Sequence, residues 1–379
     1  MNHGRLSTHF LAAFGLLLGC STLLTDELRS VPRFVPPETA HLEGSRAAHV
    51  IVIAIDGVRP QEIFDGADPS RTDEPRSARA LTPNLHTLAE RGLALGRPGV
   101  GAPMRASGPN FVSLPGYTEM LTGRPAPCQE NDCERRPEAT MADVFLDAPE
   151  KGPVAIVSSW WRLEAVAQAE RGRAFVSAGR THREGDAPWL SDQALRRALE
   201  RGEEAAPSPG WGDYRPDERT IDVALETMRA ARPRFLFVSL GDTDEHAHAG
   251  NYDGYATALA QADRFVGEVD RIARDWDARG EPTAIFVTTD HGRSASFREH
   301  GREFPESADV WVVAAGAGIP KRGEVALAQE RTLSDLPTTI AAVAGIALPE
   351  TLSGHDLTMA REPSQTLAFH GDPAEVDEN

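Results

Sequence analysis

HVIVIAIDG, residues 49–57, is the stretch of sequence that decides the fold. A run of β-branched apolar residues without polar alternation is typical of a central parallel strand that is buried on both faces. Similar runs predict further strands at residues 154–158, 235–240, 284–289 and 310–315. Apolar residues at helical spacing predict helices that alternate with these strands, at residues 82–93, 221–232, 253–278 and 333–344. Such alternation predicts an α/β fold, with a largely parallel central sheet and helices on both of its faces.

The composition indicates a globular chain with an acidic balance of charge. Of the 379 residues, 40% are hydrophobic and 25% are charged, which is atypical of a disordered chain. There are 39 Lys and Arg against 57 Asp and Glu, which gives a formal net charge of −18. This balance works against non-specific binding to nucleic acid or anionic lipid, so we expect no nucleic-acid-binding surface. A phosphate-like substrate would therefore need a locally positive site.

The first twenty residues have the features of a bacterial export signal. Arg5 precedes a short apolar run that ends in LLGC at residues 17–20. A basic end, a short apolar run and small residues before a cleavage point predict a signal peptide at residues 1–19. LLGC resembles the lipobox, so we expect a lipid anchor at Cys20, a tether over residues 20–44, and a location on the periplasmic side of the cell envelope. An ordinary cleaved signal that contains a cysteine is the alternative.

Two further cysteines, Cys128 and Cys133, enclose four polar residues. Exported chains fold under oxidising conditions, where two cysteines this close form a disulfide more often than a metal pair. A zinc knuckle would need two further ligands nearby, and the sequence offers none. We therefore predict a Cys128–Cys133 disulfide.

Carboxylate and imidazole side chains follow several of the predicted strands. Because the carboxyl ends of parallel strands meet at one edge of a sheet, we expect these side chains to gather there. Together they suit zinc, manganese or iron, whereas an all-oxygen calcium site would not use histidines. The candidate metal ligands are Asp56, Asp244, His248, Asp290, His291 and His300. Each taken singly has an alternative as a solvated or capping side chain, but their joint placement predicts a metal centre.

Ser113 is the candidate nucleophile. It precedes Leu-Pro-Gly at the predicted start of a helix, where free backbone N–H groups and the helix dipole favour an anion. A serine hydroxyl is a poor nucleophile at neutral pH unless a base or a metal removes its proton. An N-cap is the structural alternative for Ser113, and the two roles are compatible.

These motifs resemble those of the alkaline phosphatase superfamily, especially its nucleotide pyrophosphatase/phosphodiesterase-like branch and related bacterial lipoproteins. The family pattern is a strand-end Asp, a Ser or Thr nucleophile in a segment that ends in Thr-Gly, an Asp-x-x-x-His, an Asp-His-Gly and a later His. The matching residues here are Asp56, Ser113 with Thr122-Gly123, Asp244 with His248, Asp290-His291-Gly292, and His300. The order of the motifs agrees over residues 48–350.

The resemblance implies a two-metal hydrolase that acts on a small phosphorylated substrate. One ion would be held by Asp56, Asp290, His291 and the Ser113 oxygen, and the other by Asp244, His248 and His300. The two ions would lie ~3.5–4 Å apart. Zinc is the usual metal for this set of ligands, with manganese and iron as alternatives. Ser113 would form a covalent phosphoserine, which water then hydrolyses.

Two of the metal ligands have competitors in the sequence. Asp242 and His246 have the same spacing as Asp244 and His248, and related bacterial sequences favour the second pair. His355 could replace His300, which we prefer because the corresponding ligand in the family precedes a strand.

The residues that bind the phosphoryl oxygens are less defined. The phosphodiesterase branch uses an Asn beyond the nucleophile, and Asn131, between the two cysteines, is the candidate here. Asn110 is the runner-up, and a plain loop residue is the alternative for Asn131. Four arginines could each reach a further oxygen: Arg105, Arg162, Arg293 and Arg298.

The resemblance places one alkaline phosphatase-like catalytic domain at residues 45–362, followed by a C-terminal tail at residues 363–379. Residues 158–218 interrupt the alternation of strands and helices and predict a small cap-like insertion. This insertion holds Trp160, Trp161, Trp189 and Trp211. The tryptophans either cover the site or anchor loops by packing.

Several alternative functions follow from the same residues. Sulfatases of this superfamily need an Arg where Tyr117 stands, so phosphoryl or phosphonyl transfer is favoured over sulfate ester cleavage. Phosphomutases share the metal pattern, but they are usually cytosolic. From a different class, a non-catalytic lipoprotein could bind a metal or a glycan through its tryptophans. The sequence does not separate monoester, diester and phosphonate substrates, and it does not give the oligomeric state.

Overall fold

The computed structural model describes residues 46–349, 352 and 354–362 of the chain. The predicted signal peptide, Cys20, the tether and the C-terminal tail at 363–379 lie outside the described residues. None of the described helices combines the length and the apolar character needed to cross a membrane.

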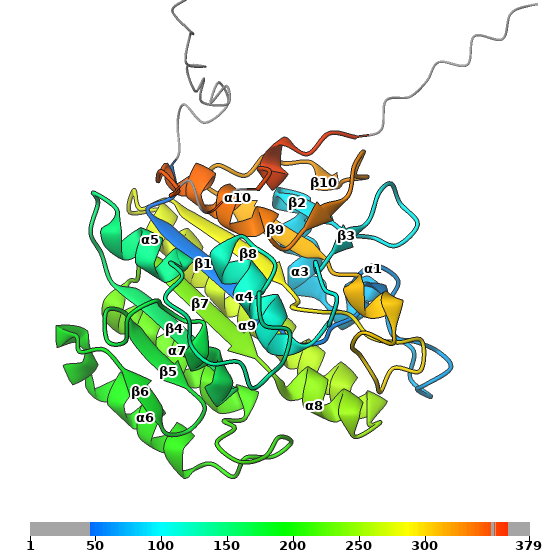
Figure 1. Cartoon of the computed structure of the whole chain (residues 1–379), viewed down its shortest axis with the longest axis horizontal. Helices are drawn as coiled ribbons and strands as arrows, with labels where there is room; N and C mark the ends of the chain where they lie inside the picture. The colour runs from blue at the N-terminus through cyan, green and yellow to red at the C-terminus, as the bar shows by residue number, and fades with distance from the viewer. Residues whose placement is uncertain (1–45, 350–351, 353, 363–379) are drawn as a thin grey trace, which may run out of the picture. The chain divides into compact units, whose positions relative to one another are not determined.

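A nine-stranded sheet forms the centre of the described part of the chain, with the strand order β10-β2-β9-β8-β1-β7-β4-β5-β6 (Figure 1). The strands are β1 (His49–Ile55), β2 (Leu93–Leu95), β4 (Val154–Ser158), β5 (Phe175–Ala178), β6 (His182–Glu184), β7 (Phe235–Leu240), β8 (Thr283–Thr288), β9 (Val312–Gly316) and β10 (Gly323–Glu324). A separate pair joins β3 (Met104–Arg105) to β11 (Arg331–Thr332).

The sheet is parallel in its middle, contains antiparallel pairs on both sides of the middle, and ends on one side with the parallel pair of β10 and β2. β1 pairs in parallel with both β7 and β8, and β4 pairs in parallel with β7 and β5. β9 runs antiparallel to β8 and β2, and β6 runs antiparallel to β5. All seven residues of β1 are buried, as predicted for a strand covered on both faces. The predicted α/β fold with a largely parallel sheet is therefore confirmed.

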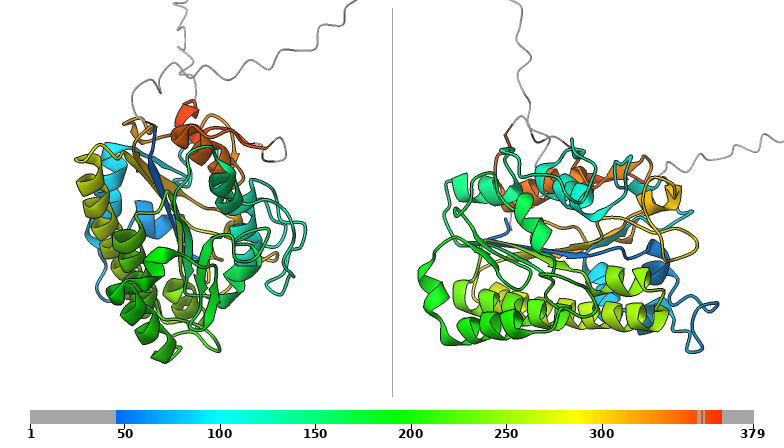
Figure 2. Two further views of the ribbon diagram at one scale, coloured as in Figure 1. Left: turned by 90° about the vertical axis from the view of Figure 1, so that its left-hand side faces the viewer. Right: turned by 60° about the horizontal axis from the view of Figure 1, so that its bottom comes forward.

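Helices cover both faces of the sheet, as Figure 2 shows. Val50, Val52 and Ala54 of β1 pack in the core under α4, α5 and α10, while Ile51 and Ile53 pack in the core under α3, α7 and α9. The helices are α1 (Pro60–Phe64), α2 (Ala78–Leu81), α3 (Pro83–Arg91), α4 (Ser113–Thr122), α5 (Met141–Asp147), α6 (Gln193–Glu204), α7 (Asp217–Ala231), α8 (Asp242–His248), α9 (Tyr252–Asp277) and α10 (Asp335–Ala344).

The segment at residues 158–218 differs from the predicted cap-like insertion. It contributes β5 and β6 to the edge of the sheet, and α6 packs beside α7. The apolar residues of β5 are fully buried against β4, so this segment completes the core instead of standing apart as a cap. Of this segment, Trp160, Trp161, Arg162, Trp211 and Tyr214 line the cleft described below.

Candidate metal centre and nucleophile

The ends of β1, β7 and β8 place three chain segments side by side. Ile55 is level with Leu240 of β7, and Ala54 is level with Thr288 of β8. The next residues along each strand therefore emerge at one edge of the sheet, which is where ligands bind in open α/β sheets. Asp56 follows β1, Asp290 follows β8, and α8 begins directly after β7.

The first ligand cluster consists of Asp56, Asp290 and His291, whose ligand atoms all lie within 4.8 Å of one another. His291 Nε2 is 3.4 Å from a carboxylate oxygen of Asp56 and 3.4 Å from one of Asp290. Ser113, the first residue of α4, points into the same cluster. Its Oγ lies 3.4 Å from Asp56 Oδ1 and 3.4 Å from His291 Nε2.

The second ligand cluster consists of Asp244, His248 and His300, again with ligand atoms within 4.8 Å of one another. Asp244 and His248 lie one turn apart on α8, and their side chains meet at 3.0 Å. His300 Nε2 is 3.0 Å from His248 Nε2. The His300 ring also stacks on His291 with a centroid distance of 3.9 Å, so it links the two clusters.

The structure separates these ligands from their competitors. Asp242 accepts a hydrogen bond from the Tyr214 hydroxyl at 2.6 Å, and His246 lies beside Asn251. Their side chains therefore leave α8 away from the ligand clusters. His355 is hydrogen-bonded to Asp335, outside both clusters.

The histidines are arranged to offer lone pairs. His291 Nδ1 lies 2.9 Å from the carbonyl of Gly292, and His300 Nδ1 lies 2.8 Å from the carbonyl of Phe111. Because a carbonyl only accepts, each Nδ1 carries the proton, and each Nε2 presents a lone pair to the cluster. Burial lowers the pKa of His300 to about 3, helped by His291. This ring is therefore neutral, which is the form that coordinates a metal.

The buried carboxylates lack the charge compensation that they need. Burial raises the pKa of Asp56 well above its ordinary value, and the neighbouring Asp290 adds to the effect. Burial likewise raises the pKa of Asp290 to about 7. Among the described residues, Asp290 Oδ2 is buried with no hydrogen-bond partner. Buried charges in proteins are paired or coordinate metals, so these carboxylates, together with the neighbouring imidazoles, fit divalent cations.

Arg293 has a role that the sequence did not single out. It was one of four arginines considered for a substrate oxygen, but its buried guanidinium contacts a carboxylate oxygen of Asp244 and donates to the carbonyl of Gly57. Burial raises the pKa of Asp244, but Arg293, His248 and His300 together outweigh burial and hold that pKa well below the usual range. Arg293 therefore helps to keep Asp244 charged. Its position directly after Asp290-His291-Gly292 was the available signal.

The role of Tyr117 was also not predicted from the sequence. Its hydroxyl donates to Asp56 Oδ2 at 2.9 Å and accepts from Ser239 at 2.9 Å. It thereby fixes one oxygen of Asp56 and leaves the other facing Ser113. The sequence marked Tyr117 only as the residue that replaces the arginine of sulfatases.

Gly57 allows the two ligand segments to approach one another. Its φ is +63°, and a Cβ at this position would lie 2.6 Å from Asp244 Oδ1. Real Cβ atoms essentially never come so close. Both the positive φ and the close approach of Asp244 therefore require a glycine directly after Asp56.

Asn131 reaches the start of α4 from the loop between the cysteines. Its Oδ1 accepts a hydrogen bond from the Leu114 N–H at 2.9 Å, next to Ser113. The loop is closed by the Cys128–Cys133 disulfide, and Arg162 donates to the Asn131 carbonyl at 3.0 Å. The runner-up, Asn110, uses its side-chain amide to bond Gln129 instead.

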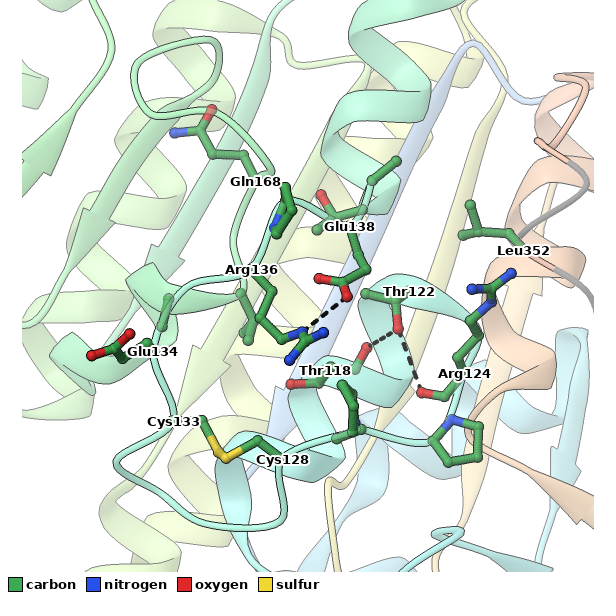
Figure 3. A pocket seen from close by; sticks show the side chains of 18 residues that line it. Thr118, Thr122, Arg124, Cys128, Cys133, Glu134, Arg136, Glu138, Gln168 and Leu352 are labelled. Carbon is green, nitrogen blue, oxygen red and sulfur yellow. Dashed lines mark hydrogen bonds and ion pairs between the residues drawn. A yellow bond between two sulfur atoms is a disulfide. The ribbon is translucent and has the colours of Figure 1, made fainter.

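Two pockets flank the disulfide loop. The larger is a cleft of about 920 Å³, whose walls include Asp56, Ser113, Asn131, Asp244 and His248. The smaller, of about 470 Å³, lies between the loop and α4, and Figure 3 shows Thr118 and Thr122 on its wall. None of the six candidate metal ligands lines the smaller pocket, so the cleft is the candidate substrate site.

Similarity to known proteins agrees with this geometry. The family model of the Metalloenzyme superfamily matches residues 212–348, a segment that contains Asp244, His248, Asp290, His291 and His300. The structure of alkaline phosphatase PafA is similar with a TM-score of 0.56 and 11% identity, over 83% of this chain and 99% of that one. The chain therefore has an alkaline phosphatase-like fold.

Two further similar proteins extend the comparison. The alkaline phosphatase-like fold also resembles the phosphonate monoester hydrolase of Agrobacterium radiobacter, with a TM-score of 0.51 and 15% identity over 82% of this chain and 76% of that one. A phosphopentomutase from Methylorubrum extorquens is 29% identical over 180 residues, which are 46% of this chain and 36% of that protein. The chain spans about a third of the length of the curated relatives it matches.

Proposed function

We propose that this chain is an exported, metal-dependent hydrolase that cleaves phosphate, phosphodiester or phosphonate esters through a covalent phosphoserine at Ser113. The observation that carries the proposal is the position of the Ser113 hydroxyl, 3.4 Å from both Asp56 and His291. A serine that served only as a helix cap would not need to face a carboxylate and an imidazole of a metal-ligand cluster. In this structure Ser113 makes no capping hydrogen bond, because the N-cap of α4 is Val112.

Two divalent cations would complete the site. One would be held by Asp56, Asp290, His291 and Ser113, and the other by Asp244, His248 and His300. Zinc suits these ligands, with manganese and iron as alternatives. When bound, the cations supply positive charge that offsets the charge of the transferring phosphoryl group.

The residues of the chain position and transfer the phosphoryl group. Ser113 Oγ forms a bond to phosphorus, while the bond from phosphorus to the leaving oxygen breaks. Ser113 is the first residue of α4, where the helix dipole favours the incoming anion. Asn131 Oδ1 accepts a hydrogen bond from the Leu114 N–H. The side-chain N–H groups of Asn131 have no partner among the described residues and can donate to a phosphoryl oxygen. Water then attacks the phosphoserine, releases phosphate and restores the hydroxyl.

The experiment that tests this proposal joins a metal assay to a hydrolysis assay. The purified chain, from the residue after Cys20 onward, is measured for metal content and for activity on nitrophenyl phosphate, its phenyl diester and an aryl phosphonate. We expect about two ions per chain, which is the stoichiometry of a two-metal site. Ser113→Ala should retain both clusters' other ligands and lose hydrolysis.

A matched pair of variants separates catalysis from folding. Asp290→Ala should lose metal and activity, whereas Asp263→Asn, a buried aspartate that binds the start of α3, should keep both. A metal-free preparation with full activity, or undiminished hydrolysis by Ser113→Ala, would refute the mechanism.

A phosphomutase is the second candidate, and the similarity to the Methylorubrum phosphopentomutase favours it. A mutase returns the phosphoryl group to its product, whereas a hydrolase releases it to water. Incubation with ribose 1-phosphate separates the two, since only a hydrolase yields inorganic phosphate in proportion to the substrate consumed.

Export and lipid anchoring rest on the sequence of residues 1–20. We expect the full-length chain to incorporate labelled palmitate in a bacterial host, and Cys20→Ala to abolish the label. Equal labelling of both forms would exclude the anchor and leave the hydrolase proposal unaffected.

A further inference from the structure

The wall of the cleft carries an aromatic surface that the proposed mechanism does not use. Trp160, Trp161 and Trp211 line the cleft together with Ser113 and Asp244. Trp211 is 78% exposed and Trp161 is 36% exposed. Exposed tryptophans have a large apolar surface to bury, and in soluble proteins such surfaces mark binding sites.

Trp211 differs from Trp160 and Trp189 of the same segment, which are partly buried and pack against the core. Trp189 packs edge-on against Phe175, with a centroid distance of 5.0 Å, as expected for a residue that anchors the core. Trp211 makes no such packing contact with another aromatic ring in the described part of the chain. Packing therefore accounts for Trp189 but leaves Trp211 unexplained.

The charged residues on the same wall are mostly acidic. Glu130, Asp132 and Glu245 line the cleft, apart from the carboxylates of the ligand clusters, and Arg162 is the one arginine among the described lining residues. The Arg162 guanidinium is already engaged, because it bonds the Asn131 carbonyl and lies over the Trp161 ring at 4.9 Å. An ester with further phosphates or carboxylates on its alcohol part would be repelled by this wall.

Aromatic faces and acidic side chains together recognise cations. The ring of a tryptophan attracts an ammonium or guanidinium group, and quaternary ammonium ligands are bound by such rings in many proteins. Arg162 over Trp161 shows that a ring of this wall already holds a cation.

We propose that the wall formed by Trp160, Trp161, Trp211, Glu130 and Asp132 binds the alkylammonium group of a phosphoester, so that amino-alcohol phosphates such as phosphocholine are preferred substrates. This inference rests on the proposed function. In the reaction, the Ser113 hydroxyl loses its proton as Oγ bonds to phosphorus, the bond from phosphorus to the amino-alcohol oxygen breaks, and the alcohol leaves with that proton. Water later displaces Ser113 and releases inorganic phosphate.

The test compares two substrates of the same shape. Phosphocholine and 3,3-dimethylbutyl phosphate differ only in a quaternary nitrogen that replaces a carbon. Released phosphate is measured with the metal-loaded chain, and kcat/KM is obtained for each. We expect a preference for phosphocholine of about tenfold, which corresponds to roughly 1.4 kcal/mol. The preference should shrink as salt is raised, because the acidic part of the wall is screened.

Variants assign the preference to the wall. Trp211→Ala and Glu130→Gln should each lower the ratio of the two kcat/KM values toward one, and both residues are exposed, so the fold should be retained. Trp189→Phe is the matched control outside the cleft, and it should keep the ratio. A melting curve for each variant confirms folding.

The outcomes separate this inference from the proposed function. If nitrophenyl phosphate is hydrolysed but the ratio is one or less, the inference is wrong and the hydrolase stands. Faster turnover of a neutral sugar phosphate than of phosphocholine would also overturn it and identify the wall as a carbohydrate platform. If no phosphoester is hydrolysed by the metal-loaded chain, both proposals fail.

Discussion

The Tyr117 hydroxyl controls the orientation of Asp56. It holds one carboxylate oxygen and is itself held by Ser239, while the ring packs edge-on against Phe237. Hydrogen bonds of this kind orient metal ligands and tune their affinity. The Tyr117 hydroxyl therefore contributes to the site through Asp56, and Tyr117 is not among the residues that line the cleft.

Tyr117→Phe tests this orientation because it keeps the ring and removes only the hydroxyl. We expect metal affinity or kcat/KM to fall by about 10–100-fold, as for other residues that support metal ligands. Metal titration followed by activity measurement checks the result. Tyr252→Phe is the control, since that hydroxyl binds Glu62 outside the centre. Equal affinities in native protein and Tyr117→Phe would contradict the assigned role.

The loop of residues 128–133 is the element that positions Asn131. It has no regular structure, and it is held by the disulfide and by Arg162. Without the disulfide, the loop gains conformational freedom that opposes placement of the amide beside Ser113.

Replacement of both Cys128 and Cys133 by serine should lower kcat/KM for nitrophenyl phosphate and leave the metal content unchanged. The expected fall is about tenfold, because a hydrogen bond to a charged group is worth about 1.5–3 kcal/mol. In an Asn131→Ala background the same replacement should have little further effect. A full additional loss in that background would show that the loop acts through something other than Asn131.

Glu119 joins α4 to the start of α10. Its buried carboxylate accepts hydrogen bonds from the backbone and hydroxyl groups of both Ser107 and Ser334. Burial raises the pKa of Glu119 in spite of these bonds. A folded-state pKa above the unfolded value means that this group stabilises the protein below about pH 4.5, its ordinary value, and that this contribution is lost as the pH rises through the folded pKa.

Glu119→Gln should therefore change the pH dependence of stability. The free energy of unfolding of the native chain should fall more between pH 4.5 and pH 7.5 than that of the variant, because glutamine does not ionise. Urea unfolding at the two pH values measures both slopes. Parallel slopes would show that Glu119 does not titrate differently in the folded protein.

The elements themselves were largely predictable from the sequence. The strand at residues 49–55 was identifiable because a parallel strand buried on both faces needs an unbroken apolar run. The direction of β9 was not predictable, since the apolar run at 310–315 is the same for a parallel and an antiparallel strand. The same limit applies to residues 158–218, whose short strands β5 and β6 gave no clear alternation.

The contacts of the centre were predictable only in part. It could be predicted that Asp56, Asp290 and the other ligands of the two clusters gather at one place. The sheet brings the carboxyl ends of its parallel strands together at one edge. Tyr117 and Arg293 could not be assigned, since their partners depend on how α4 and the loop after β8 pack. Those partners are set by tertiary packing, which no local pattern records.

At the scale of the whole molecule, the centre ties together segments far apart in the chain. Its ligands follow β1, β7 and β8, and Ser113 comes from α4. Ions that bind only the folded arrangement stabilise it by mass action.

Removal of the ions should lower the melting temperature. At a free metal concentration of 100 times Kd the expected stabilisation is about 2.7 kcal/mol, which is roughly 4 °C for a folded domain of more than 300 residues. Calorimetry before and after chelation measures the shift. Asp290→Asn should show a smaller shift, because it binds less metal. Identical melting temperatures, with metal loss verified by elemental assay, would argue against ions at these strand ends.

The stacking of His300 on His291 also couples the two halves of the centre. Each ring belongs to a different cluster; the ring centroids lie 3.9 Å apart, and the planes make an angle of 14°. An ion that fixes the tilt of one imidazole thereby restricts the tilt of the other, so the two occupancies are thermodynamically linked. Since linkage is reciprocal, filling either half first should change the affinity of the remaining half by the same factor, and metal uptake should deviate from two independent binding steps.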